Sequence, residues 1–207
     1  MRIFNTIKTY TLAASLAAAP LCVTKTYSQP KEFYISNNIY EKYIKPQGIV
    51  DKRILSCAPS PKIEVAGKKE IAGIVVDTKR NILYRYDDLG VPINAYLIAS
   101  GKESTPTPTG LRIVTHVEKY PYSTAPKRTK RRRYPRDYGK YVVCLNIVDP
   151  NTGAQRTTSV FIHGCKSYYQ TFEAVPSRRV SHGCIRMAEE GIEEVKNVKP
   201  GTYVRID

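Results

Sequence analysis

The sequence predicts a mainly β protein of the sandwich or barrel type, with one short helix near its C-terminal end. Short apolar runs recur at a spacing of about ten residues from residue 71 onward, and Asp, Asn, Gly and Pro separate them. Only residues 188–197 carry a helical pattern, with acidic residues in the first turns. A hydrophobic content of 42% in 207 residues supplies enough apolar surface for one packed domain plus an extension.

The first two expected strands form a hairpin. Residues 71–76 and 82–86 are apolar runs, and the segment Asp77–Asn81 between them has turn composition. Further strands are expected at residues 93–99, 111–117, 141–148, 159–163 and 202–206. Together with the helix Ala188–Asn197, they predict one β domain over residues 70–207.

The N-terminal residues 1–28 have the composition of a secretory signal peptide. Arg2 and Lys8 precede an apolar run, Thr11–Val23, that is shorter than the roughly 20 residues of a membrane span. Cleavage within this segment and retention as a membrane anchor remain open, and both place the rest of the chain in an extracytoplasmic space such as the periplasm. Residues 29–69 are expected to form an extension or linker that packs along the domain.

A candidate nucleophile lies in the segment Val180–Met187. We expect Cys184 to lie at the N-terminus of the helix that follows, where the helix dipole favours a thiolate. Gly183 allows a sharp turn beside the sulfur. The backbone N–H groups of His182, Gly183 and Cys184 could then converge on a developing oxyanion.

A candidate general base lies upstream in the chain. His163 follows an apolar, strand-like run and could bring an imidazole to the Cys184 sulfur. Ser181 is expected to support the turn before the cysteine. Arg186 follows the cysteine by two residues, and its guanidinium suits a substrate carboxylate or a structural contact.

The His and Cys residues also admit a metal site as an alternative. His163 with Cys165, and His182 with Cys184, could provide two His and two Cys ligands to zinc, although this spacing is unusual for zinc sites. We expect no metal and no cofactor, and we expect His116 to be structural. Oxidising surroundings would permit a disulfide between two of the three remaining cysteines, and the sequence does not choose the pair, but we expect all three to be reduced and buried: Cys57, Cys144 and Cys165.

Two motifs carry a resemblance to a known family. His163, a spacer of seventeen residues and then Ser181-His182-Gly183-Cys184-Ile185-Arg186 resemble the signature of the L,D-transpeptidase catalytic domain, the YkuD-like family. The segment Thr105–Gly110 resembles the Thr-Pro-x-Gly turn of the same family. The resemblance covers residues 70–207, and it implies that the main-chain carbonyl of Gly164 orients the His163 ring.

The resemblance also implies a function. An enzyme of this family attacks a peptidoglycan tetrapeptide stem with its cysteine, releases D-alanine and passes the acyl group to an amine of a second stem. Two alternatives stay open. With water as the acceptor the enzyme would be an L,D-carboxypeptidase or hydrolase, and with a degenerate site the protein would only bind the cell wall.

Residues 119–140 interrupt the β pattern with nine Lys and Arg residues against the single acid Asp137. A charge run of this kind is often a solvated loop. The resemblance places it as a lid over the active cleft, where it would attract anionic cell-wall or envelope polymers, and Tyr138 is expected to bind substrate. The net charge of +15 also suits nucleic acid, but secretion argues against that partner.

Overall fold

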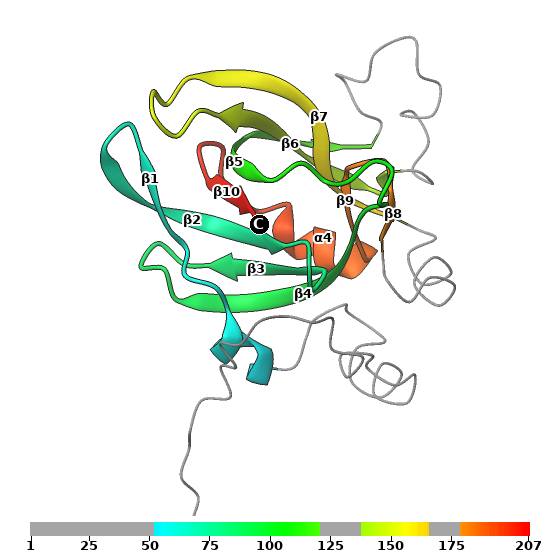
Figure 1. The fold of residues 1–207 in the computed structure, drawn as a ribbon. Coiled ribbons are helices and arrows are strands. Elements are labelled where there is room, and N and C mark those ends of the chain that lie inside the picture. The colour runs from blue at the N-terminus through cyan, green and yellow to red at the C-terminus, as the bar shows by residue number, and fades with distance from the viewer. Residues whose placement is uncertain (1–51, 121–137, 166–178) are drawn as a thin grey trace, which may run out of the picture.

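A computed structural model describes residues 52–120, 138–165 and 179–207. The expected signal segment, most of the expected extension and most of the basic lid lie outside these residues. The described chain forms a mixed sheet of ten strands with one short α-helix (Figure 1). The fold class predicted from the sequence is therefore confirmed.

The strands and helices have the following bounds. The elements are η2 Lys52–Cys57, β1 Lys62–Val65, β2 Lys68–Asp77, β3 Ile82–Tyr86, β4 Pro92–Gly101, β5 Gly110–Lys119, β6 Tyr141–Val148, β7 Gln155–Gly164, β8 Arg179–Ser181, β9 Ile185–Met187, α4 Glu189–Val195 and β10 Tyr203–Ile206. Within the described ranges, no helix has the length and apolar character needed to cross a membrane.

The predicted hairpin is confirmed as the antiparallel pair β2–β3, in which Asp77 lies opposite Ile82. The carboxylate oxygen Oδ1 of Asp77 accepts hydrogen bonds from the backbone N–H groups of Lys79 and Arg80. Asn81 closes the turn with a φ of 56°, a left-handed conformation that Asn tolerates better than most residues. The turn therefore forms where its residue types predict it.

The sheet curls into a near-barrel because its strands follow the order β1-β2-β10-β5-β6-β7-β9-β4-β3 and β3 also pairs with β2. The C-terminal strand β10 lies between β2, to which it is parallel, and β5, to which it is antiparallel. Strand β9 lies between β7, parallel, and β4, antiparallel. The interior contains a cluster of buried aliphatic side chains, and α4 contributes Ile192 and Val195 to it.

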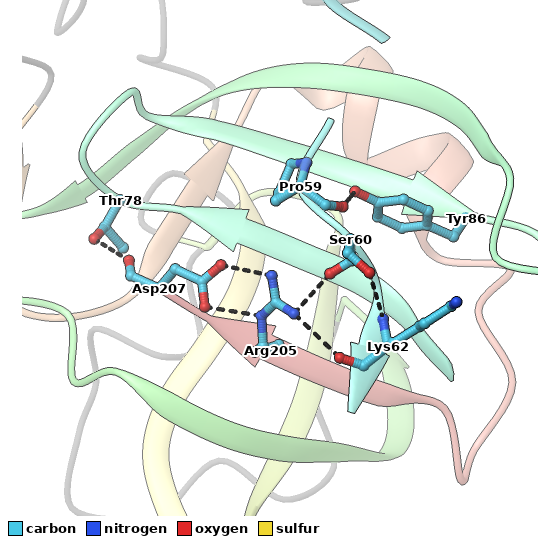
Figure 2. A network of polar contacts seen from close by, with 7 residues as sticks. All are labelled: Pro59, Ser60, Lys62, Thr78, Tyr86, Arg205 and Asp207. Carbon is cyan, nitrogen blue, oxygen red and sulfur yellow. Dashed lines mark hydrogen bonds and ion pairs between the residues drawn. The ribbon is translucent and has the colours of Figure 1, made fainter. Parts of the chain in front are cut away.

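The sheet begins earlier in the chain than the expected domain boundary at residue 70. Strand β1 pairs with β2, and residue 70 falls inside β2. Figure 2 shows the polar network that joins the preceding segment to the C-terminal strand: the Arg205 guanidinium donates to the Ser60 carbonyl at 2.7 Å and to both carboxylate oxygens of Asp207 at 2.8 Å. Tyr86 donates to the Pro59 carbonyl at 2.5 Å. The end of the expected linker is therefore part of the domain.

The helix α4 is close to its predicted position, but it does not begin at the candidate cysteine. Strand β9 lies between Cys184 and α4, and the helix starts at Glu189 after the N-cap Ala188. The expectation that Cys184 lies at a helix N-terminus is therefore wrong. The apolar residues Ile185 and Met187, both fully buried, are better placed in a short strand between β7 and β4 than in a first helical turn.

Candidate active site

The imidazole of His163 is fixed in one tautomer. His163 lies near the end of β7, is 1% exposed and contacts the Gly164 carbonyl oxygen through Nδ1 at 2.7 Å. A carbonyl oxygen can only accept a hydrogen bond, so Nδ1 carries the hydrogen. In the neutral ring Nε2 then presents its lone pair, which is the arrangement that a general base needs.

The environment of His163 keeps the ring neutral. Burial lowers the pKa of His163 to about 3, and the positive charge of Arg186 acts in the same direction, whereas the hydrogen bond to Gly164 opposes the shift. Near neutral pH the ring is therefore unprotonated. An imidazolium formed during a reaction would need a nearby negative charge, and a thiolate on the next strand is a suitable source.

The Tyr138 ring lies against the His163 ring. The two ring centroids are 4.6 Å apart with a tilt of 52°, and the Tyr138 ring meets Phe161 edge-on at 6.5 Å. The next residue, Gly139, has a φ of +64° and lies so close to the Gly164 backbone that a Cβ there would fall 2.6 Å from its carbonyl carbon. This close approach fixes Tyr138 over the candidate base, so the residue expected to bind substrate contacts His163 directly.

The register of β7 and β9 places Arg186 opposite His163 and Cys184 just before the paired residues. The two strands are parallel, with Ile162 opposite Ile185 and His163 opposite Arg186. Cys184 immediately precedes this pairing. Its side chain is partly buried, and its Sγ donates to the Ser159 carbonyl at 3.6 Å. The three residues that the sequence placed in one site therefore come from β7, from β9 and from the residue just before β9.

Ser181 organises the turn that leads to Cys184. Its hydroxyl is buried, donates to the Cys184 carbonyl at 2.6 Å and accepts from the Gly183 N–H at 3.0 Å. Gly183 has a φ of 110°, a conformation that favours glycine. Because the Gly183 N–H is engaged within the turn, it could serve an oxyanion only if that bond opened. The other expected donors are the N–H groups of His182, which is exposed, and Cys184.

A neighbouring loop supports this turn in a way that sequence reasoning did not identify. The backbone N–H of Lys102 and the hydroxyl of Thr105 both donate to the Ser181 carbonyl, at 3.0 and 3.3 Å. The guanidinium of Arg112 binds the loop from the other side through the carbonyls of Pro108 and Thr109. The Thr-Pro motif therefore packs against the cysteine turn, and its alternating Thr and Pro residues were the available signal.

The alternative zinc site of His163, Cys165, His182 and Cys184 does not form. Among the described residues, groups that could hold a metal come together only at His116, Glu118 and Cys144. No disulfide joins the four cysteines within the described ranges. Cys144 and Cys165 are buried as expected, Cys165 against Ala99 and Ala188, whereas Cys57 is only partly buried.

A cysteine thiol just before β9 and a neutral imidazole on the adjacent strand β7 are the two groups that a site of the nucleophile–base class uses. A sequence model of the L,D-transpeptidase catalytic domain, YkuD, matches residues 72–206, and the chain belongs to this family. At the level of the family, membership implies a cysteine enzyme and peptidoglycan stem peptides as substrates. No curated protein matches the chain.

Solved structures of similar proteins include three from different bacteria. The catalytic domain of the Enterococcus faecium L,D-transpeptidase is 24% identical, with 67% of this chain and 98% of that chain covered and a TM-score of 0.42. Bdellovibrio bacteriovorus Bd1075 is 19% identical, with 72% and 53% covered and a TM-score of 0.47. L,D-transpeptidase 3 from Mycobacterium tuberculosis, in complex with a faropenem-derived adduct, is 18% identical, with 72% and 69% covered and a TM-score of 0.44. The chain thus spans about half of the Bdellovibrio protein, and the family assignment rests on the sequence model.

Proposed function

We propose that this protein is a peptidoglycan L,D-transpeptidase that joins two stem peptides through a cysteine thioester. The observation that carries the proposal is the hydrogen bond from His163 Nδ1 to the Gly164 carbonyl at 2.7 Å. It leaves Nε2 as the proton acceptor, on the strand next to the one that Cys184 precedes.

The reaction has two steps that conserve atoms and charge. His163 Nε2 takes the thiol proton of Cys184 while the sulfur attacks the carbonyl carbon of the third, diamino-acid residue of the stem. The tetrahedral intermediate collapses to a thioester, and the leaving D-alanine takes the proton from the imidazolium. The amine of a second stem then attacks the thioester while His163 takes its proton, and the leaving Cys184 thiolate takes this proton back from the imidazolium.

Arg186 is the proposed ligand of a substrate carboxylate. It lies opposite His163 in the sheet, and its Nε is buried without a hydrogen-bond partner among the described residues. A guanidinium binds a carboxylate through two parallel hydrogen bonds. Tyr138 would cover the base and contact the stem. The N–H groups of His182 and Cys184, joined by that of Gly183 if its bond to Ser181 opens, would stabilise the oxyanion.

The cellular setting is part of the proposal. Residues 1–28 would direct the protein to an extracytoplasmic compartment, the periplasm in a bacterium with two membranes, either with cleavage or with a retained membrane anchor. The basic lid, residues 119–140, would attract anionic cell-wall or envelope polymers. Deletion of residues 127–133 should weaken binding to such polymers most strongly at low salt, and unchanged binding at low salt would contradict this part.

The function is tested by incubating the purified protein with a disaccharide tetrapeptide and following the products by mass spectrometry. A cross-linked dimer together with free D-alanine is the expected result. Tripeptide alone would indicate the carboxypeptidase, and binding without any product would indicate a wall-binding protein. Cys184→Ala should abolish product, whereas Cys57→Ala, which removes another partly buried thiol, should not. Product formation by Cys184→Ala would overturn the mechanism.

A further inference from the structure

Three side chains of types that can bind a metal lie together on the sheet face that carries His163. In the antiparallel ladder β5–β6–β7, Glu118 pairs with Val142 and Val142 with His163, while His116 pairs with Cys144. Directly paired residues share one face of a sheet. Successive residues alternate between faces, and the adjacent Val143 and Ile162 belong to the interior cluster. His116, Glu118 and Cys144 therefore lie, like His163, on the face opposite to the interior. His116 and Glu118 on β5 are two strands from β7, about 10 Å, and Cys144 on β6 is one strand from it.

The tautomer of His116 is coupled to its neighbour Thr115. The Thr115 hydroxyl is 3.2 Å from the Cys144 carbonyl and 2.9 Å from His116 Nδ1. When the single hydroxyl hydrogen points to Nδ1, Nε2 carries the ring hydrogen. When it points to the Cys144 carbonyl, the hydroxyl oxygen accepts from His116 and Nδ1 carries the ring hydrogen. In the neutral ring of this second tautomer, Nε2 presents a lone pair.

This lone pair points at a carboxylate. His116 Nε2 lies 3.0 Å from Glu118 Oε1, and the Glu118 side chain is only 7% exposed. In this tautomer the two acceptors require a positive centre between them, which is either a second ring proton or a metal cation; in the other tautomer the Nε2–H donates to Glu118. A buried carboxylate is generally paired with a cation or coordinates a metal.

The third side chain, Cys144, favours a metal cation over a ring proton. The Cys144 Sγ lies with the other two ligand atoms in a cluster in which all are within 4.8 Å of one another. A thiol does not strengthen an imidazolium–carboxylate ion pair, whereas nitrogen, sulfur and oxygen ligands together form a common donor set for zinc. We propose that His116, Glu118 and Cys144 bind a zinc ion, with the fourth position taken by water.

The geometry needs only small side-chain adjustments. In a tetrahedral zinc site, the nitrogen and oxygen ligands lie about 3.3 Å apart and the nitrogen and sulfur ligands about 3.6 Å apart, from bond lengths of roughly 2.0–2.3 Å. Thr115 supplies the acceptor that a zinc-bound histidine uses for its other ring N–H. It can do so because the β5–β6 register shifts between Val114 and His116, so that Thr115 lies opposite the Cys144 backbone.

Zinc binding at this site involves neither the Cys184 thiol nor the His163 ring. On binding, the Cys144 thiol gives its proton to solvent and the sulfur coordinates as a thiolate, so affinity rises with pH. Because the three ligands come from β5 and β6, the bound ion joins these strands and stabilises the folded protein by mass action. The bound ion would thus stabilise the pairing of β5 with β6 on the sheet face that carries His163.

The site is tested in the full chain carrying Cys184→Ala, which removes the reactive thiol. Cobalt(II) replaces zinc as a spectroscopic probe, and a charge-transfer band from thiolate to cobalt reports coordination by sulfur. We expect one metal ion per chain, a cobalt band that zinc displaces, and a higher unfolding midpoint with zinc. Cys144→Ser should remove the band, whereas Cys165→Ser, which changes another buried thiol, should keep it.

His116→Ala provides a variant that should still fold, because 46% of this side chain is exposed. It should weaken zinc binding at least tenfold, and the effect of zinc on its unfolding midpoint is compared with its own metal-free midpoint, because the change also removes the partner of the buried Glu118 carboxylate. Three results would each overturn the proposal: no stoichiometric metal in the parent protein, a cobalt band that survives Cys144→Ser, or zinc affinity unaffected by His116→Ala. In those cases His116 and Glu118 form an ion pair only.

Discussion

Replacement of Gly139 by alanine should disturb the candidate site through the backbone of Gly164. A Cβ at residue 139 would lie 2.6 Å from the Gly164 carbonyl carbon, 2.7 Å from its Cα and 2.1 Å from Glu189 Oε1. The end of the Glu189 side chain can rotate away, but the Gly164 backbone is held in β7. Because the Gly164 carbonyl accepts from His163, any shift of this backbone also moves the candidate base.

Two terms set the size of the effect. Gly139 has a φ of +64°, and a left-handed conformation costs an alanine about 1–2 kcal/mol. Forcing an extra methyl group into a packed site adds about 1–3 kcal/mol. Gly139→Ala should therefore lower the free energy of unfolding by roughly 2–5 kcal/mol. Gly67 has a φ of +76° with nothing within 4 Å of the added Cβ. Gly67→Ala should therefore lose only the free energy that the left-handed backbone conformation costs an alanine.

Urea unfolding of the two variants and the parent protein provides the measurement, since the midpoint shift at constant slope gives the change in stability. Glu189→Ala combined with Gly139→Ala should recover only part of the loss, because the contact with Gly164 remains. Turnover of the tetrapeptide should fall in Gly139→Ala and persist in Gly67→Ala. Equal destabilisation by the two glycine replacements would refute the reasoning, since it would mean that the contact with Gly164 is absent.

Three further predictions concern protonation and stability. The pKa of His163 is lowered from 6.5 to about 3, so between these pH values only the unfolded state binds the proton. The free energy of unfolding should therefore fall by about 1.4 kcal/mol per pH unit as the pH drops. His163→Gln should remove this slope between about pH 6 and 5, which lies above most carboxylate titrations. Arg205→Ala should lower the free energy of unfolding by about 1–2 kcal/mol through loss of the bond to the Ser60 carbonyl; an unchanged urea midpoint would contradict this. Tyr96→Phe should cost about 2 kcal/mol, because the buried hydroxyl donates to the Glu194 carboxylate at 2.6 Å; the double variant with Glu194→Gln should show that the two losses are not additive.

Alternation and turn chemistry were enough to predict most of the strands. The run Tyr141–Val148 forms β6 with the predicted bounds, and Asp77 closes the first hairpin as its residue type indicates. These features depend on neighbours in the sequence. The closure of the sheet does not, because β10 pairs with β2 and β5 from the other end of the domain, and no local pattern reports that register.

The candidate site was only partly predictable, because a sequence motif reports neighbours in the chain and not the pairing of strands. The motif placed His163 and Cys184 together, but it did not show the short strand that follows the cysteine, since three residues are too few for a periodicity. The cluster around His116 was missed altogether. Its partner Cys144 is 28 residues further along the chain, and only the pairing of β5 with β6 brings the two together.

The position of β9 changes the explanation of how the Cys184 thiol would ionise. A helix dipole acts within the first turn, and α4 starts at Glu189, beyond β9, with acidic residues at its N-terminus. The ionised sulfur must therefore be stabilised by groups on the strands. The described candidates are the His163 imidazole, once it has accepted the proton, and the Arg186 guanidinium opposite it. A substrate carboxylate that neutralised Arg186 would act on both groups, because the guanidinium disfavours a proton on His163 and favours the thiolate. His163 would become a stronger base, and its imidazolium would then be the main positive charge that stabilises the sulfur.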